Sequence, residues 1–170
     1  MSGTAPRTYT PEEVLPVFGL APEDGLPGYA PRTVSTGTAM LMAPLRSLDA
    51  LRRARMDVNA YAALKDRGDF FCPHLFCVQG ATPAGDTFAR GLGLPPDVVE
   101  DPFTGSATGA MAAYLWRYGL LAAPRFVAEQ GHWMNRPGQA NVEVVGPRDA
   151  IEAVKVAGAA VTVLRGELEL

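Results

Sequence analysis

The chain has 170 residues, of which 48% are hydrophobic and 19% are charged, and its net charge is −3. This composition is typical of a soluble globular protein with one domain. The acidic balance argues against duplex nucleic acid as the main partner, and the chain has no run of about 18 apolar residues that would predict a membrane span.

The N-terminal residues have neither the basic region nor the apolar region of a signal peptide. The two cysteines, Cys72 and Cys77, are too few for a disulfide framework. We therefore expect a cytoplasmic location. The 18 glycines and 15 prolines predict a turn-rich protein with many short elements.

Residues 1–9 are expected to form a disordered tail in front of a single domain over residues 10–170. A helix signal opens the domain. Thr10 can cap the helix, Pro11 fits its first position, and the Glu13 side chain can bond back to the N–H of the cap. This pattern predicts a short helix.

Further elements follow in the first half of the chain. Residues 33–42 are expected to form one strand that contains a glycine, and Ser47 is expected to cap a helix that reaches residue 54. A second helix is predicted over 59–65. Pro73 suggests an edge strand or a bulge. Strands are expected over residues 69–79, 87–92, 125–130, 139–145, 153–156 and 159–170.

The segment over residues 107–118 reads as a helix whose main polar residues are Thr108 and Arg117. A helix that is apolar nearly all round is a buried one, and its alanines let other elements approach closely. Strands surround this segment in the sequence. The pattern therefore predicts an α+β domain in which strands wrap around a central helix.

The turn over residues 104–109 is the best candidate for a binding site. Free N–H groups at a helix N-terminus bind anions, Gly105 allows a close approach, and Ser106 adds a hydroxyl. The turn has no lysine, which argues against a phosphate loop and favours a carboxylate guest. The alternative is an ordinary glycine turn capped by Thr104 or Ser106.

Asp101 precedes this turn, and a carboxylate beside an anion site can act as a general acid or base. The alternative is a solvated loop aspartate. Ser106 does not fit a nucleophile elbow, which needs a glycine where Thr104 stands. The sequence identifies no partner for His74 or His132.

Three other patterns are weaker. The spacing of Cys72, His74 and Cys77 matches no common zinc pattern, so we expect no metal site and read these residues as buried strand positions. Residues 91–96 lack the third glycine of a dinucleotide fingerprint. Residues 130–138 read as a turn between two strands, although its aromatic residue and Arg136 could touch a ligand.

The segment Glu100-Asp101-Pro102-Phe103-Thr104-Gly105-Ser106-Ala107 resembles the motif EDPVTGSA of the phenazine-biosynthesis isomerases, the PhzF-like family, which is related to diaminopimelate epimerase. Other features follow in the family's order. They are residues 34–37, 45–64, 130–131, 136–138, 158–161 and 166–168. The resemblance covers roughly residues 10–170.

The resemblance implies a diaminopimelate-epimerase-like domain, with a central buried helix wrapped by mostly antiparallel strands. It also implies proton transfer on a small carboxylate without any cofactor. Asp101 would assist the proton transfer. The substrate carboxylate would be bound at Thr104, Gly105, Ser106 and Ala107.

This chain corresponds to the second half of the family's sequence. The family's main acid/base glutamate and a substrate-contacting histidine belong to the first half, and Thr108 stands where many members have histidine. The first hypothesis is therefore an isomerase, or a subunit of one, completed by a second copy or by a partner chain with the first half. The second is a carboxylate-binding or interaction module without catalysis. Both predict self-association, most simply as a homodimer.

Overall fold

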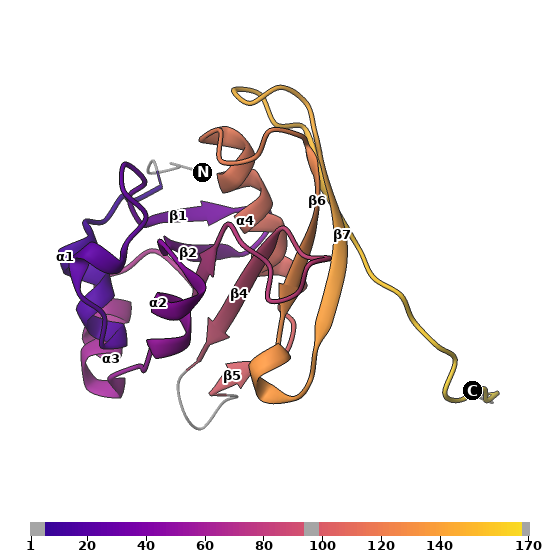
Figure 1. Ribbon diagram of the computed structural model, residues 1–170, viewed down its shortest axis with the longest axis horizontal. Helices are drawn as coiled ribbons and strands as arrows, with labels where there is room; N and C mark the ends of the chain where they lie inside the picture. Colours follow the sequence, from indigo (N-terminus) through magenta and orange to yellow (C-terminus); the bar gives the residue numbers. More distant parts are fainter. Residues whose placement is uncertain (1–5, 94–98, 168–170) are drawn as a thin grey trace.

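A curled sheet wraps around one helix, α4 (Gly105–Arg117), in the computed structural model, which describes residues 6–93 and 99–167 (Figure 1). The strand order is β1-β2-β3-β4-β6-β7-β8, and β5 pairs with β4. The pairs β2–β3 and β4–β6 are parallel and the others are antiparallel. The predicted α+β architecture is confirmed. The strands are β1 (Arg32–Ser35), β2 (Ala39–Pro44), β3 (Cys72–Cys77), β4 (Thr87–Leu92), β5 (Glu100–Asp101), β6 (Arg125–Gln130), β7 (Gly138–Val145) and β8 (Ala153–Ala157).

Helix α4 is buried along most of its length, as its composition predicts. Its residues from Ala107 to Leu115 are all buried, and most of them are alanine, glycine or threonine. These small side chains allow the strands to pack closely around the helix. Larger side chains such as Met42, Phe76 and Met111 fill the space between helix and sheet. Each such side chain contributes about 1.5–3 kcal/mol when it leaves water.

The other face of the sheet is covered by three short helices, α1 (Pro11–Val14), α2 (Leu48–Arg53) and α3 (Val58–Asp66) (Figure 1). A second apolar cluster, which includes Leu51 and Phe88, lies between these helices and β2, β3 and β4. No helix within residues 6–93 and 99–167 is long and apolar enough to cross a membrane.

The helix starts follow the local signals in the sequence. Thr10 and Glu13 form the predicted reciprocal cap, in which each side chain accepts a hydrogen bond from the other residue's backbone N–H. The Ser47 side chain caps α2. Helix α3 starts one residue earlier than predicted because the Asp57 carboxylate accepts hydrogen bonds from two backbone N–H groups of the first turn.

Two strand predictions in the first half of the chain are wrong. Residues 33–42 form a hairpin of β1 and β2 instead of one strand, and the chain reverses at Gly37, whose φ of 139° is accessible to glycine. Pro73 lies in the central strand β3 and not at an edge. Pairing of β3 with β4 begins only at His74, so the proline removes no hydrogen bond from that ladder.

The two ends of the described chain also differ from expectation. Arg7 and Tyr9 do not belong to a disordered tail: the Thr33 N–H donates to the Arg7 carbonyl oxygen, and the Tyr9 side chain is buried. Residues 1–5 lie outside the described residues. The strand expected over 159–170 is not formed within 158–167, because no neighbouring strand lies beside this segment. Residues 168–170 also lie outside the described residues.

Candidate functional site

Asp101 stands on the short strand β5, directly opposite Gly91 of β4. The missing side chain at Gly91 is what makes room for the following turn. A Cβ atom at position 91 would lie 2.8 Å from the Thr104 Oγ1 atom. Thr104 therefore occupies the space over Gly91, and its hydroxyl donates a 2.8 Å hydrogen bond to Asp101 Oδ2.

The side-chain amide of Gln130, at the end of β6, is hydrogen-bonded to both Asp101 and Thr104. Its Nε2 atom donates to the Asp101 carbonyl oxygen over 2.7 Å and to the Thr104 hydroxyl over 3.2 Å. Its Oε1 atom accepts from the Thr104 backbone N–H. Gln130 is buried, so this amide is fixed. The sequence marks Gln130 only by its place before Gly131, and its role was not predicted.

The N-terminus of α4 has no side-chain cap. Thr104 is the N-cap residue, but its hydroxyl is turned toward Asp101. The alternative of an ordinary turn capped by Thr104 is therefore wrong. Gly105 and Ser106 are exposed, and nothing lies within 4 Å of the position of a Cβ atom at Gly105. The start of α4 is thus open to an anion at Gly105 and Ser106, which the helix dipole also favours, whereas Ala107 is fully buried.

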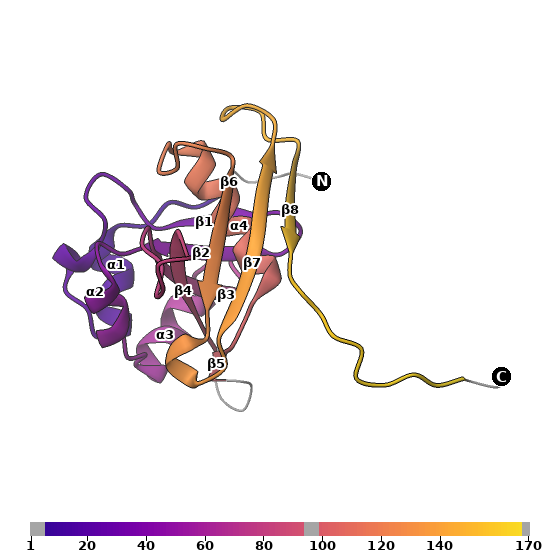
Figure 2. The same ribbon diagram turned by 45° about the vertical axis from the view of Figure 1, so that its right-hand side comes forward.

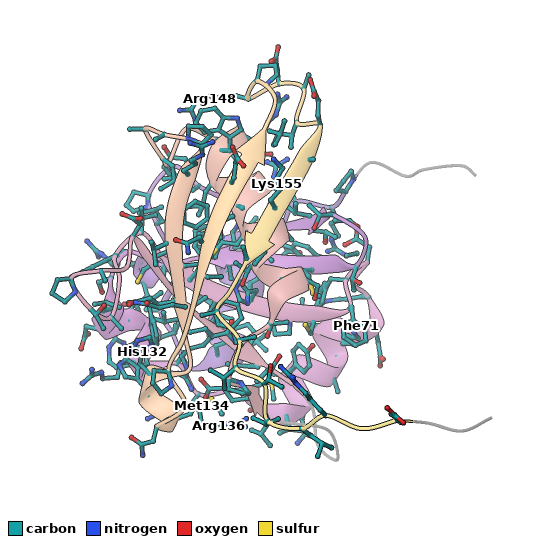
Figure 3. The ribbon with its side chains drawn as sticks, turned by 90° about the vertical axis from the view of Figure 1, so that its right-hand side faces the viewer. Phe71, His132, Met134, Arg136, Arg148 and Lys155 are labelled. Carbon is teal, nitrogen blue, oxygen red and sulfur yellow. The ribbon has the colours of Figure 1, made fainter. Side chains whose placement is uncertain are left out.

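Gly131 and Gly138, at the two ends of the β6–β7 connection, allow this connection to pack closely against the Asp101–Thr104 turn. A Cβ atom at Gly131 would lie 2.5 Å from the Pro102 carbonyl oxygen, and one at Gly138 would lie 2.6 Å from a Phe103 ring atom. Figure 3 shows His132, Met134 and Arg136 at this end of the β6–β7 hairpin, with Arg148 at the opposite end. The connection is a hairpin turn, as predicted, and it supports the Asp101 turn.

Arg90, on β4, links β5 to helix α2 through hydrogen bonds. Its guanidinium makes two 2.8 Å hydrogen bonds to the Glu100 carboxylate, and it also donates to the carbonyl oxygens of Leu51 and Ala54 at the end of α2. Both side chains of this ion pair are largely buried. Glu100, the residue before Asp101, is therefore fixed by an ion pair that solvent screens poorly.

His74 lies in the same row of the sheet as Asp101. It pairs with Gly91 in β3–β4, and Gly91 pairs with Asp101 in β4–β5. Because direct cross-strand partners share one face, His74 and Asp101 lie on the same face with only a glycine between them. His74 is fully buried, and neither ring nitrogen has a hydrogen-bond partner among the described residues. Burial lowers the pKa of His74 to about 4, against a weaker opposing effect of the Asp101 charge.

This burial predicts an acid sensitivity of the fold. Below pH 6.5 the unfolded chain binds a proton at His74, whereas the folded chain does so only near pH 4. Stability is therefore lost as the pH falls, by about 2 kcal/mol from this residue between pH 7 and pH 5. We expect His74→Leu to lose correspondingly less stability over this interval in urea unfolding. An equal loss in both proteins would show that His74 titrates normally in the fold.

Within residues 6–93 and 99–167, no three histidine, cysteine, aspartate or glutamate side chains gather as a metal-ligand group, and residues 94–96 of the 91–96 pattern lie outside the described residues. Cys77 belongs to the cluster beneath the short helices, whereas Cys72 packs toward α4, so the strand separates the two cysteines. Neither histidine makes a hydrogen bond to Ser106 among the described residues, which leaves no base for a serine nucleophile. His132 instead packs edge-on against Phe88, with ring centroids 5.5 Å apart.

A family model described as phenazine biosynthesis-like protein matches residues 6–166. An uncharacterized isomerase of Clostridium acetobutylicum is 29% identical over 167 residues, which cover 94% of this chain and 54% of that protein. The uncharacterized isomerase YddE of Escherichia coli K12 is 28% identical over 158 residues, with coverage of 91% and 52%. The chain thus spans about half the length of the curated relatives it matches.

Solved structures share this fold, in which a curled sheet wraps around a central helix. A structure described as a predicted epimerase from Pseudomonas aeruginosa superposes with a TM-score of 0.68 at 32% identity and covers 94% of this chain and 55% of its own. A PhzF-family protein from Bacillus anthracis gives a TM-score of 0.72 at 23% identity, with coverage of 90% and 54%, which shows the shared fold. The match over nearly the whole chain and the shared architecture together show that this chain belongs to the phenazine biosynthesis-like (PhzC-PhzF) family.

Proposed function

We propose that this chain provides one wall of an isomerase or epimerase site that moves a proton on a small carboxylate substrate without a cofactor. One observation carries the proposal. The Asp101 carboxylate and the uncapped N-terminus of α4 are joined in a single turn by Thr104 and Gln130. An acid/base group thus lies beside an anion-binding site, which is the arrangement that proton transfer next to a carboxylate requires.

The roles follow from position. The substrate carboxylate binds the exposed residues Gly105 and Ser106, through their N–H groups and the Ser106 hydroxyl, while Thr104 keeps its hydroxyl on Asp101. Asp101 takes or delivers the proton. The relatives are named uncharacterized isomerases and a predicted epimerase, which supports this class of reaction. A cytoplasmic location, expected from the low number of cysteines, stays a prediction.

Proton relocation needs one group that removes the proton and one that delivers it. Asp101 supplies one of them. We infer that the second comes from the wall opposite α4, on a second copy of the chain or on a partner chain that carries the first half of the relatives. The relatives are about twice as long as this chain, which supports a wall of that size.

A second candidate function is carboxylate binding without turnover. The observation that favours it is that a single acid/base residue, Asp101, lies at the helix N-terminus in the part of the chain that the structure describes. In that case the chain binds small carboxylates but exchanges none of their protons with solvent.

Both functions require the carboxylate site, which Ser106→Ala tests. We expect the variant to bind a small carboxylate about tenfold or more weakly, because it loses a hydrogen bond to a charged group. Calorimetric titration with a panel of small carboxylates measures the change. Thr38→Ala is the matched control, since Thr38 is an exposed hydroxyl residue in the β1–β2 hairpin. Equal dissociation constants for wild type and Ser106→Ala would place the carboxylate elsewhere.

A further inference from the structure

His74 is a buried polar side chain that the proposed chemistry does not use. Its ring is fully buried, and neither nitrogen has a hydrogen-bond partner among the described residues. A buried polar group without a partner destabilises a fold, so such groups are rare in native proteins and call for an explanation. A leucine would fill the same space without this cost. The position of the ring relative to Asp101 indicates what the imidazole does.

The His74 side chain lies on the side of the sheet that faces α4. Side chains alternate between the two faces of a strand. Leu75 belongs to the cluster beneath the short helices, and Phe76 belongs to the cluster around α4. His74 precedes Phe76 by two residues and therefore points to the α4 side. This is the concave side of the curled sheet.

His74 and Asp101 flank the space that the Thr104 hydroxyl occupies. Strands β3, β4 and β5 are neighbours, and His74, Gly91 and Asp101 form one row across them (Figure 2). Neighbouring strands lie about 4.8 Å apart, so the backbones of β3 and β5 are about 10 Å apart at this row. Gly91 leaves the middle of the row empty, and Thr104 Oγ1 fills it. The imidazole and the carboxylate thus lie on two sides of one hydroxyl group.

The His74 ring is suited to accept a hydrogen bond. Burial lowers the pKa of His74 to about 4, against the smaller opposite effect of the Asp101 charge. At neutral pH the ring is therefore uncharged, with one N–H group and one nitrogen that carries a lone pair. Because the ring is a weak base, this nitrogen can accept a hydrogen bond without taking the proton from its donor.

The turn needs such an acceptor when Asp101 is protonated. In the structure the Thr104 O–H donates to Asp101 Oδ2, which suits an ionised carboxylate. A protonated carboxyl group instead donates its own O–H to Thr104, whose hydroxyl then needs another acceptor. Gln130 does not supply one, because its Nε2 atom donates to the hydroxyl and its Oε1 atom accepts from the Thr104 backbone N–H. The lone pair of His74 is the acceptor that remains in this row.

We propose that His74 is a positioning residue, whose unprotonated ring nitrogen accepts the hydrogen bond of the Thr104 hydroxyl while Asp101 carries a proton. When Asp101 takes the proton, the Thr104 O–H turns from Asp101 to His74, and the new O–H of Asp101 donates to Thr104 Oγ1. When Asp101 delivers the proton, Thr104 returns to the arrangement in the structure. The proton stays on Asp101 throughout. This role rests on the proposed function, in which Asp101 takes and delivers a proton.

Proton exchange from heavy water into a dihydro-hydroxyanthranilate tests the role, with the full chain in its native assembly. We expect His74→Leu to lower kcat about tenfold or more, the effect of losing one hydrogen bond at the reacting group, and to leave KM unchanged. His74→Asn and His74→Gln place an amide oxygen near the positions of the two ring nitrogens. At least one of these variants should recover most of the wild-type kcat.

Met42→Leu is the matched control, because Met42 is fully buried and pairs directly with His74 across β2 and β3. It changes the packing beside the ring and removes no acceptor, so it should exchange at the wild-type rate. Urea unfolding confirms that each variant is folded. An unchanged kcat in His74→Leu, with exchange lost in Asp101→Asn, would overturn the role of His74 alone. A loss that neither amide variant recovers would show a packing effect and would also overturn it. A wild type without exchange would overturn the isomerase function and this role together.

Discussion

Asp101→Asn is expected to reduce exchange between substrate and solvent protons by about 10²–10⁴-fold, the range that a positioned general acid or base contributes. The amide oxygen of asparagine can still accept the hydrogen bond from Thr104, so the turn should keep its shape. The amide cannot take or deliver the proton. NMR in heavy water measures the exchange into a small carboxylate with an acidic C–H bond, such as a dihydro-hydroxyanthranilate.

Asp66→Asn is the control for this substitution, because Asp66 is an exposed aspartate at the end of α3. It should exchange protons at the wild-type rate. If Asp101→Asn and wild type exchange at the same measurable rate, Asp101 is not the acid/base group. If wild type binds the carboxylate and exchanges nothing, even in its native assembly, the binding function is the correct one.

Arg90→Met is expected to lower the free energy of unfolding by about 3–5 kcal/mol, the cost of leaving one partner of a buried ion pair uncompensated. Methionine retains most of the side-chain volume, so the loss reports the guanidinium. The Glu100 carboxylate and the carbonyl oxygens of Leu51 and Ala54 lose their donor. Urea unfolding measures the difference.

Arg125→Met tests the same chemistry at the surface. Arg125 pairs with Glu143 over 2.7 Å, but its side chain is 76% exposed, and such pairs contribute about 0–1 kcal/mol. The two variants should therefore differ clearly. Equal losses would mean that the Arg90–Glu100 pair does not hold β5, and the position of Asp101 would then need another explanation.

The local signals of the sequence were sufficient for most element boundaries. The reciprocal cap of Thr10 and Glu13 and the cap at Ser47 involve residues within one helical turn, so the chain needs no distant contact to start those helices. Helix α4 was expected from residue 107 and starts at Gly105. Its N-cap residue is therefore Thr104, and the helix begins two residues before the expected start.

Predictions that depended on distant partners were less successful. Pro73 reads as an edge residue, yet its place is decided by where β4 begins to pair. The row of His74, Gly91 and Asp101 joins three strands whose register the sequence does not show. Gln130 lies 29 residues from Asp101 and is identified as its support only by the fold. The motif predicted where the site lies, while its supporting contacts required the structure.

Both proposed functions require that the open N-terminus of α4 binds a carboxylate beside Asp101. The most direct test is a titration of the ¹⁵N-labelled protein with small carboxylates, followed by the amide resonances in NMR. We expect saturable shifts of the Gly105, Ser106 and Ala107 amides, and weaker binding in Ser106→Ala. Saturable shifts confined to other elements, or no shifts with any member of the panel, would contradict it.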